Sequence, residues 1–191
     1  MPFISHSVHV KIAPPGLKDS HKLHSNCKFG LVEEVTYLLA SPAIDPNRRD
    51  QDFRTPLHIA SSYGQLECAR LLLKRGGKVN SQDKLGRCPL HYAVESGNFD
   101  LVKLLAVDYA ANVNALTEIG SCPMHVAAGE GHAQILSLFV NKGAARFTQD
   151  KRAQGSYRLY GLRSSKRMKS AYQGLLRDDV KVARHHPLRV G

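Results

Sequence analysis

The stretch Thr55-Pro56-Leu57-His58 returns as Cys88-Pro89-Leu90-His91 and again as Cys122-Pro123-Met124-His125, at nearly equal intervals. In each copy a Gly follows the His at the same distance, as at Gly64, and an Asn precedes the Thr or Cys, as at Asn47. A fainter copy lies one interval upstream, at Leu23-His24. A period of about 33 residues is typical of a stack of small helical units rather than of a domain built around one centre.

Each element of the repeat has a structural reason, and together they predict two short helices per unit. The hydroxyl of Thr55 can accept from the first free amides of a helix, and Pro56 fits the first turn, where its missing N–H costs nothing. Gly64 is placed to end this helix with a positive φ. A second helix is expected at 67–74, ended by Gly76-Gly77. Because helices this short are marginal alone, packing between units must hold them.

With these features the chain resembles the ankyrin-repeat family, in which Thr-Pro-Leu-His opens the first of two antiparallel helices. Val-Asn follows the second helix in that family, as at Val79-Asn80 and Val113-Asn114 here. The resemblance implies an all-α solenoid of paired antiparallel helices with connecting turns. We expect an N-terminal extension at 1–19, an ankyrin-repeat domain at 20–148 with repeats near 20–47, 48–80, 81–114 and 115–148, and a basic C-terminal tail at 149–191.

The cysteines depart from the family pattern at two equivalent places. Cys88 and Cys122 stand where the family usually has Thr, as at Thr55, which removes a capping hydroxyl that contributes about 1 kcal/mol. Equivalent atoms of stacked units lie about 10 Å apart, too far for a disulfide, whose Cα atoms must approach within about 7 Å. The chain has no C-x-x-C pair, so no zinc site is expected.

Two turn positions also depart from the pattern. Phe53 stands where Gly86 supplies the turn residue of the next unit. The third unit carries one extra residue near 108–109, with Ala110 at the place of Gly76. We therefore expect a distorted helix end in the third unit.

The ends of the stack should differ. Glu34 occupies the position of Cys68, Leu101 and Ile135, so this face of the first unit is expected to meet water, as a terminal repeat requires. At the other end the next Thr-Pro-Leu-His is absent. Either residues 157–176 form a degenerate covering helix or the stack stays partly open with a poorly ordered tail, which we favour. A shortened product of a longer repeat protein is a further interpretation.

The net charge of +11 resides mainly in the tail. Residues 1–150 hold 16 Lys and Arg against 14 Asp and Glu, whereas residues 151–191 hold 11 against 2. Lys166, Arg167 and Lys169 resemble a short nuclear-localisation signal, and the tail could contact nucleic acid through charge. No apolar run is long enough to span a bilayer, and residues 1–20 lack the features of a signal peptide. We expect a cytoplasmic monomer, with nuclear entry as the alternative.

The histidines favour structure over chemistry. His58, His91 and His125 occupy one repeated position, and in the family this imidazole hydrogen-bonds within its turn and to the neighbouring unit. No nucleophile–base pair, phosphate loop or paired carboxylates stand outside the repeat. We therefore expect no enzyme, no cofactor and no metal.

In ankyrin-like stacks the turn tips and the ends of the first helices line a concave surface. Carried over by position, this surface predicts a protein-binding site whose residues do not repeat from unit to unit. Its members are Gln51, Asp52, Phe53, Arg54, Tyr63, Lys84, Leu85, Arg87, Glu95, Glu118, Ile119 and Glu130. The expected function is a non-enzymatic scaffold or adaptor for a partner protein of unknown identity. The alternative is a nuclear regulator whose repeats bind a transcription or chromatin factor while the tail gives nuclear import or nucleic-acid contact.

Overall fold

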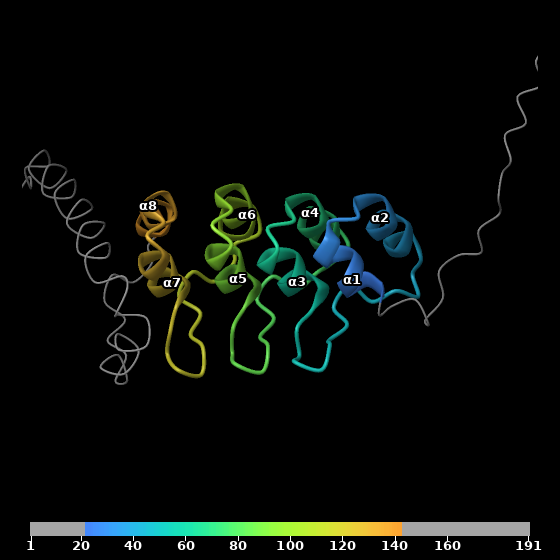
Figure 1. Ribbon diagram of the computed structural model, residues 1–191, viewed down its shortest axis with the longest axis horizontal. Helices are drawn as coiled ribbons and strands as arrows, with labels where there is room; N and C mark the ends of the chain where they lie inside the picture. Colours follow the sequence, from blue (N-terminus) through green and yellow to red (C-terminus); the bar gives the residue numbers. More distant parts are fainter. Residues whose placement is uncertain (1–21, 143–191) are drawn as a thin grey trace, which may run out of the picture.

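The computed structural model describes residues 22–142, which form a row of four helix pairs without any β-strand (Figure 1). The pairs are α1 (Lys22–Phe29) with α2 (Val32–Ala40), α3 (Pro56–Ser62) with α4 (Leu66–Lys74), α5 (Pro89–Glu95) with α6 (Phe99–Lys103), and α7 (Pro123–Glu130) with α8 (Ala133–Asn141). The π-helical turn η2 (Leu104–Asp108) continues α6. The predicted all-α stack of helix pairs is confirmed.

Several sequence predictions fall outside the described residues. They concern the extension at 1–19, the end of the last repeat, the tail at 149–191 with its covering helix at 157–176, and the signal-like residues Lys166, Arg167 and Lys169. The domain boundaries at residues 19 and 148 therefore stay predictions.

The pairs stack in two layers. The first helices (α1, α3, α5 and α7) lie side by side, and so do the second helices (α2, α4, α6 and α8), while the loops that join one pair to the next all project from the same edge (Figure 1). The apolar core runs along the stack between the layers, and it contains equivalent residues such as Leu57 and Leu90 from successive first helices. Each unit thus buries its apolar face against its neighbours.

Three of the first helices begin with the same hydrogen-bonded cap. The side chain of Thr55, Cys88 or Cys122 accepts from the backbone N–H of the following His, whose side chain in turn accepts from the backbone N–H of the capping residue. The two cysteines thus keep a cap, in which the sulfur atom, a weak acceptor, takes the place of the hydroxyl oxygen. The stability lost with the hydroxyl stays a prediction.

The repeated histidine joins each unit to the next. His58 Nδ1 accepts from the Thr55 N–H at 3.0 Å, so Nε2 carries the proton and donates to the carbonyl of Arg87 at 3.2 Å. His91 bonds in the same way to the carbonyl of Ser121, also at 3.2 Å. Burial lowers the pKa of both His58 and His91 to about 4. These imidazoles are neutral at pH 7 and serve as buried links within the scaffold.

The extra residue of the third unit is absorbed by a wider helical turn. The N–H of Tyr109 donates to the carbonyl of Leu104 at 3.1 Å, which is an i→i+5 bond and inserts one residue into the turn. The chain then reverses at Ala110, whose φ is +50°. The predicted distortion of this helix end is confirmed.

The first unit exposes the predicted face. Glu34 is exposed, whereas Cys68, Leu101 and Ile135 at the equivalent position of the later units are buried. A charge thus stands where the stack meets water. At the other end, whatever follows Lys142 lies outside the described residues.

Candidate protein-binding surface

The loops at 50–54, 83–87 and 117–121 are closed in the same way. Asp50 Oδ1 accepts the backbone N–H groups two and four residues later, both at 2.9 Å, and Asp83 Oδ1 accepts the equivalent pair at 2.8 Å. In the third loop Thr117 Oγ1 accepts the N–H of Ser121 at 3.0 Å. Sequence reasoning missed these residues, although they recur with the period of the repeat. The side-chain bonds fix the shape of each tip.

The three loop tips are also bonded to one another. The N–H of Lys84 donates to the carbonyl of Asp52 at 3.0 Å, and the N–H of Glu118 donates to the carbonyl of Leu85 at 2.9 Å. The tips therefore form one backbone-linked row, and their relative positions are set before any partner arrives.

Phe53 occupies a turn position that favours glycine. Its φ is +61°, close to the +73° and +77° of the glycines at the same place in the next two loops. A left-handed conformation costs a residue with a Cβ about 1–2 kcal/mol. Two cations lie over the ring, with Arg49 Cζ at 5.8 Å and Lys84 Nζ at 5.7 Å from its centroid.

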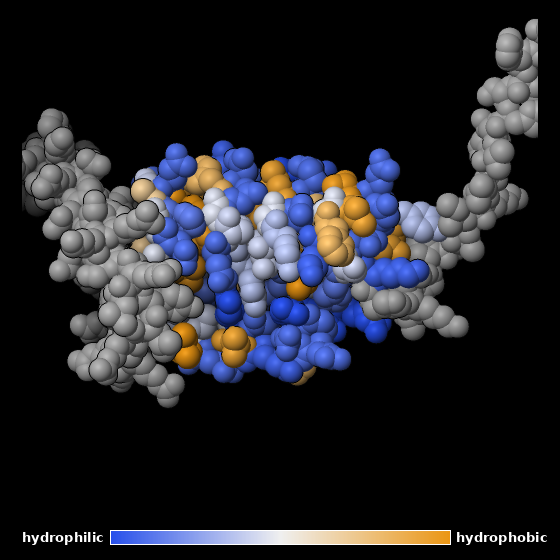
Figure 2. All heavy atoms as spheres, viewed as in Figure 1, coloured by the Kyte–Doolittle hydropathy of each residue, from blue (hydrophilic) through white to orange (hydrophobic). Residues whose placement is uncertain are grey.

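Each loop tip exposes a large apolar side chain. Phe53 is 49% exposed, Leu85 is 59% exposed and Ile119 is 52% exposed. Figure 2 shows hydrophobic atoms among hydrophilic ones along the edge formed by the loops. Side chains of this kind on a rigid backbone can serve as anchors for a partner.

An aromatic pair lies at the ends of α1 and α3, and the sequence analysis identified only one of its two members. Tyr63 at the end of α3 is 51% exposed, and Phe29 at the end of α1 is 65% exposed. Lys28 Nζ lies 5.5 Å from the centroids of both rings. The sequence does contain a signal for Phe29, because it precedes Tyr63 by one repeat. This signal was missed because the first unit lacks the Thr-Pro pair.

The charged residues of the first two loops are largely paired. Arg54 contacts Asp50 at 2.9 Å and Asp52 at 3.3 Å, and Lys84 lies 3.7 Å from Asp52. Burial opposes ionisation of Asp50, but hydrogen bonds from the backbone and side chain of Arg54 outweigh it and lower its pKa. The Arg54 guanidinium therefore supports the loop in addition to lining it.

Arg87 is held in a similar network one unit later. Its guanidinium pairs with Glu95 and stacks over the ring of Tyr92, with Cζ 4.1 Å from the centroid. The Tyr92 hydroxyl donates to Asp83 Oδ2 at 2.6 Å, and burial together with this bond raises the pKa of Tyr92 to about 12. Arg87 thus presents a fixed rather than a mobile charge.

The structure places all twelve predicted residues on the loops or at the ends of the first helices. Ten of them are exposed, and Arg54 and Arg87 are half-buried. We call this set, together with Lys28 and Phe29, the candidate surface.

Metal-binding and membrane-spanning features are absent from the part of the chain that the structure describes. Within residues 22–142 no group of three or more His, Cys, Asp or Glu side chains is placed to hold a metal ion. No helix in this range is both long and apolar enough to cross a membrane. The four cysteines, all of which lie in this range, are free and buried.

A family model described as ankyrin repeats in three copies matches residues 23–117. The chain belongs to the ankyrin-repeat family. The fourth helix pair, α7 with α8, lies beyond the matched residues but continues the ankyrin pattern with its own capped Pro-Met-His helix start. The described ankyrin stack is therefore longer than the matched segment.

Ankyrin segments of this chain are similar to parts of much larger proteins. Potassium channel GORK of Arabidopsis thaliana is 45% identical over 67 residues, 35% of this chain and 8% of the channel. The human SH3 and multiple ankyrin repeat domains protein 2 is 34% identical over 85 residues, 44% of this chain and 4% of that protein. The human SMC5-SMC6 complex localization factor protein 1 is 38% identical over 90 residues, 47% of this chain and 8% of that protein. This chain thus spans under a tenth of each of these relatives.

Ankyrin repeats are a protein–protein interaction module and are generally non-enzymatic. The repeats of this chain therefore imply a protein partner, while the similarity leaves the identity of that partner open.

Proposed function

We propose that this chain is a scaffold or adaptor that binds a segment of a partner protein on the candidate surface. The observation that carries the proposal is the row of loop tips, which are bonded to one another through the backbone and expose Phe53, Leu85 and Ile119. Because the row is already ordered, binding needs little rearrangement of this chain, and less binding energy is lost to ordering.

The apolar tips are large enough to matter energetically. Full burial of a Leu, Ile or Phe side chain stabilises a complex by about 1.5–3 kcal/mol. These side chains are about half exposed, so covering each contributes about 1 kcal/mol. Together they supply about a hundredfold in affinity. Arg54, Lys84 and Arg87 near these tips are paired with carboxylates, so they favour register and specificity more than raw affinity.

The relatives support a binding role rather than a reaction. Proteins whose names describe a potassium channel and a complex localization factor share this module, although their descriptions have nothing else in common. A module shared by proteins with such different names fits recognition of a partner better than one common reaction.

Affinity capture with a matched pair of variants tests the proposal. The tip variant, Leu85→Ser/Ile119→Ser, removes two exposed apolar side chains from the loops. The control variant, Leu31→Ser/Val32→Ser, removes two exposed apolar side chains from the start of α2, away from the loop tips. Quantitative mass spectrometry of the captured proteins should show partners that the control variant retains and the tip variant loses.

Equal retention by the tip variant would refute the candidate surface. Both variants should unfold at the wild-type midpoint, because each substitution lies on the surface, so a loss of partner cannot be attributed to misfolding.

The nuclear-regulator alternative stays a prediction. Its distinctive residues, Lys166, Arg167 and Lys169, lie outside the described residues, and so does any nucleic-acid contact of the tail. The cytoplasmic location proposed for the scaffold likewise rests on the sequence alone.

A further inference from the structure

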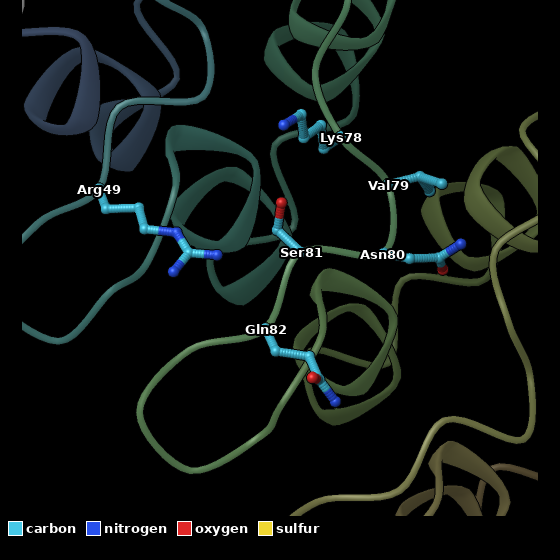
Figure 3. Close-up of a pocket in the computed structure, with 6 residues that line it drawn as sticks. All are labelled: Arg49, Lys78, Val79, Asn80, Ser81 and Gln82. Atoms are coloured by element: carbon cyan, nitrogen blue, oxygen red, sulfur yellow. The ribbon is translucent and has the colours of Figure 1, made fainter.

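A hollow of about 490 Å³ lies where the chain leaves α4 for the next loop. It is lined by Arg49 from the preceding connection and by the consecutive residues Lys78, Val79, Asn80, Ser81 and Gln82 (Figure 3). The volume falls within the range of about 300–1,000 Å³ that is usual for ligand pockets. It is therefore large enough to receive side chains of a bound segment.

The lining carries two cations and no anion. Within residues 22–142 neither Arg49 nor Lys78 takes part in an ion pair, and Arg49 Cζ lies 5.8 Å from the centroid of the Phe53 ring. The carboxylates nearest in sequence are already engaged, Asp50 by Arg54 and Asp83 by Tyr92. The positive charge of the hollow is thus left uncompensated by the part of the chain that the structure describes.

Some polar side chains of the lining already make hydrogen bonds within the described residues, and others do not. Asn80 Oδ1 accepts the N–H of Asn112 at 2.9 Å, and Gln82 Nε2 donates to the carbonyl of Gly86 at 3.3 Å. The Ser81 hydroxyl has no hydrogen-bond partner among the described residues, and Figure 3 shows the Arg49 side chain extending toward it. The available groups are therefore a guanidinium, an ammonium and a hydroxyl, all of which can donate to an anion.

We propose that this hollow binds the carboxylate side chains of an acidic peptide segment from another protein. The C-terminal tail of this chain does not supply the acidic segment, because residues 151–191 hold 11 Lys and Arg against 2 Asp and Glu. Charge complementarity therefore favours a segment of another protein. Arg49 also contacts the ring of Phe53, so a segment seated in the hollow can continue onto the loop tips. The inference rests on the proposed function only in taking the ligand to be a protein segment.

Peptide binding to the intact chain tests this inference. The probes are two pools of fluorescein-labelled 12-residue peptides that share the same apolar residues and differ only by Glu in one pool and Gln in the other. Fluorescence anisotropy should show that the Glu pool binds about tenfold more tightly, as expected for charge-assisted hydrogen bonds. The preference should shrink as salt is raised from 50 to 500 mM, since both cations are exposed.

The hollow variant, Arg49→Ser/Lys78→Ser, should bind both pools equally. The matched charge control, Lys74→Ser/Lys103→Ser, removes two exposed cations outside the hollow and should keep the tenfold preference. All four substituted residues are exposed, and unchanged midpoints of thermal unfolding will show that both variants fold.

Four results would overturn the inference. They are no preference for Glu over Gln, a Glu preference that the hollow variant keeps, an equal loss in the charge control, or tight binding of a labelled 12-nucleotide RNA that the hollow variant abolishes while the Glu pool stays unbound. The tip variant separates this inference from the proposed function. If the hollow variant keeps the Glu preference while the tip variant loses captured partners, the hollow is refuted and the scaffold proposal stands.

Discussion

Lowering the pH from 7.5 to 5.5 is expected to destabilise the stack by about 3 kcal/mol through His58 and His91. Burial lowers the pKa of both imidazoles to about 4, from the value of 6.5 that they have in the unfolded chain. Between these two values the unfolded state binds more protons than the folded state. The stabilising contribution is therefore complete above pH 6.5 and is lost progressively as the pH falls toward 4.

The magnitude follows from the linkage between proton binding and folding. At pH 5.5 an imidazole with these two pKa values loses between about one and two kcal/mol of stability, and two of them lose about 3 kcal/mol. This is a large fraction of the roughly 5–15 kcal/mol that usually separates folded from unfolded domains. Asp50 does not contribute in this window, because its pKa is lowered from an ordinary value of 3.8.

Urea unfolding at pH 7.5, 6.5 and 5.5 measures the effect as a fall in the free energy of unfolding. The matched variant is His58→Gln/His91→Gln, since Gln can also accept the N–H of the capping residue but does not titrate. It should be less stable than wild type at pH 7.5 and nearly independent of pH down to 5.5. A wild-type change under about 1 kcal/mol, or an equal slope in the variant, would contradict the reasoning.

Three further predictions concern single positions, each measured by thermal or urea unfolding. Gly76→Ala should destabilise by about 1 kcal/mol, because a φ of +83° is unfavourable for a residue with a Cβ, while the added Cβ itself meets only open space. Ala110→Gly should stabilise by about the same amount, because the φ of +50° is then relieved of its Cβ. Changes of stability with the same sign in both variants would refute this backbone explanation. Cys88→Thr should stabilise by about 0.5–1 kcal/mol, because a hydroxyl is a better acceptor than a thiol; a loss of stability would show that the sulfur packs better than it caps. Asn98→Ala should cost about 1–2 kcal/mol, because its side chain caps α6 and donates to a carbonyl of the preceding unit, both at 3.0 Å; an unchanged midpoint would mean that water replaces both bonds.

The fold was predictable because its signals are local and repeated. The prolines at 56, 89 and 123 marked three helix starts, and the extra residue before Ala110 marked a distorted end. The form of that distortion was not predictable, because a π turn and a looped-out residue satisfy the same sequence and packing decides between them. The thiol cap at Cys88 was missed because capping preferences are averages that favour hydroxyl groups. They do not show that a buried sulfur can accept the same hydrogen bond when the turn around it is already formed.

The candidate surface was predictable in position but not in character. The register located the loop tips and Tyr63, whereas the bonds that join Lys84 to Asp52 depend on how neighbouring units stack. Phe29 was overlooked because its unit has lost the Thr-Pro pair that made the others visible. The pairing of Arg54 and Arg87 also required coordinates, since long charged side chains reach several neighbours.

The dissociation constant of one captured partner for three forms of the intact chain tests the central claim most directly. Isothermal titration calorimetry should give similar constants for wild type and for the control variant at Leu31 and Val32. The tip variant at Leu85 and Ile119 should bind at least about tenfold more weakly, because it removes two half-exposed apolar side chains that the partner would cover. Binding by the tip variant within about twofold of wild type would contradict the account.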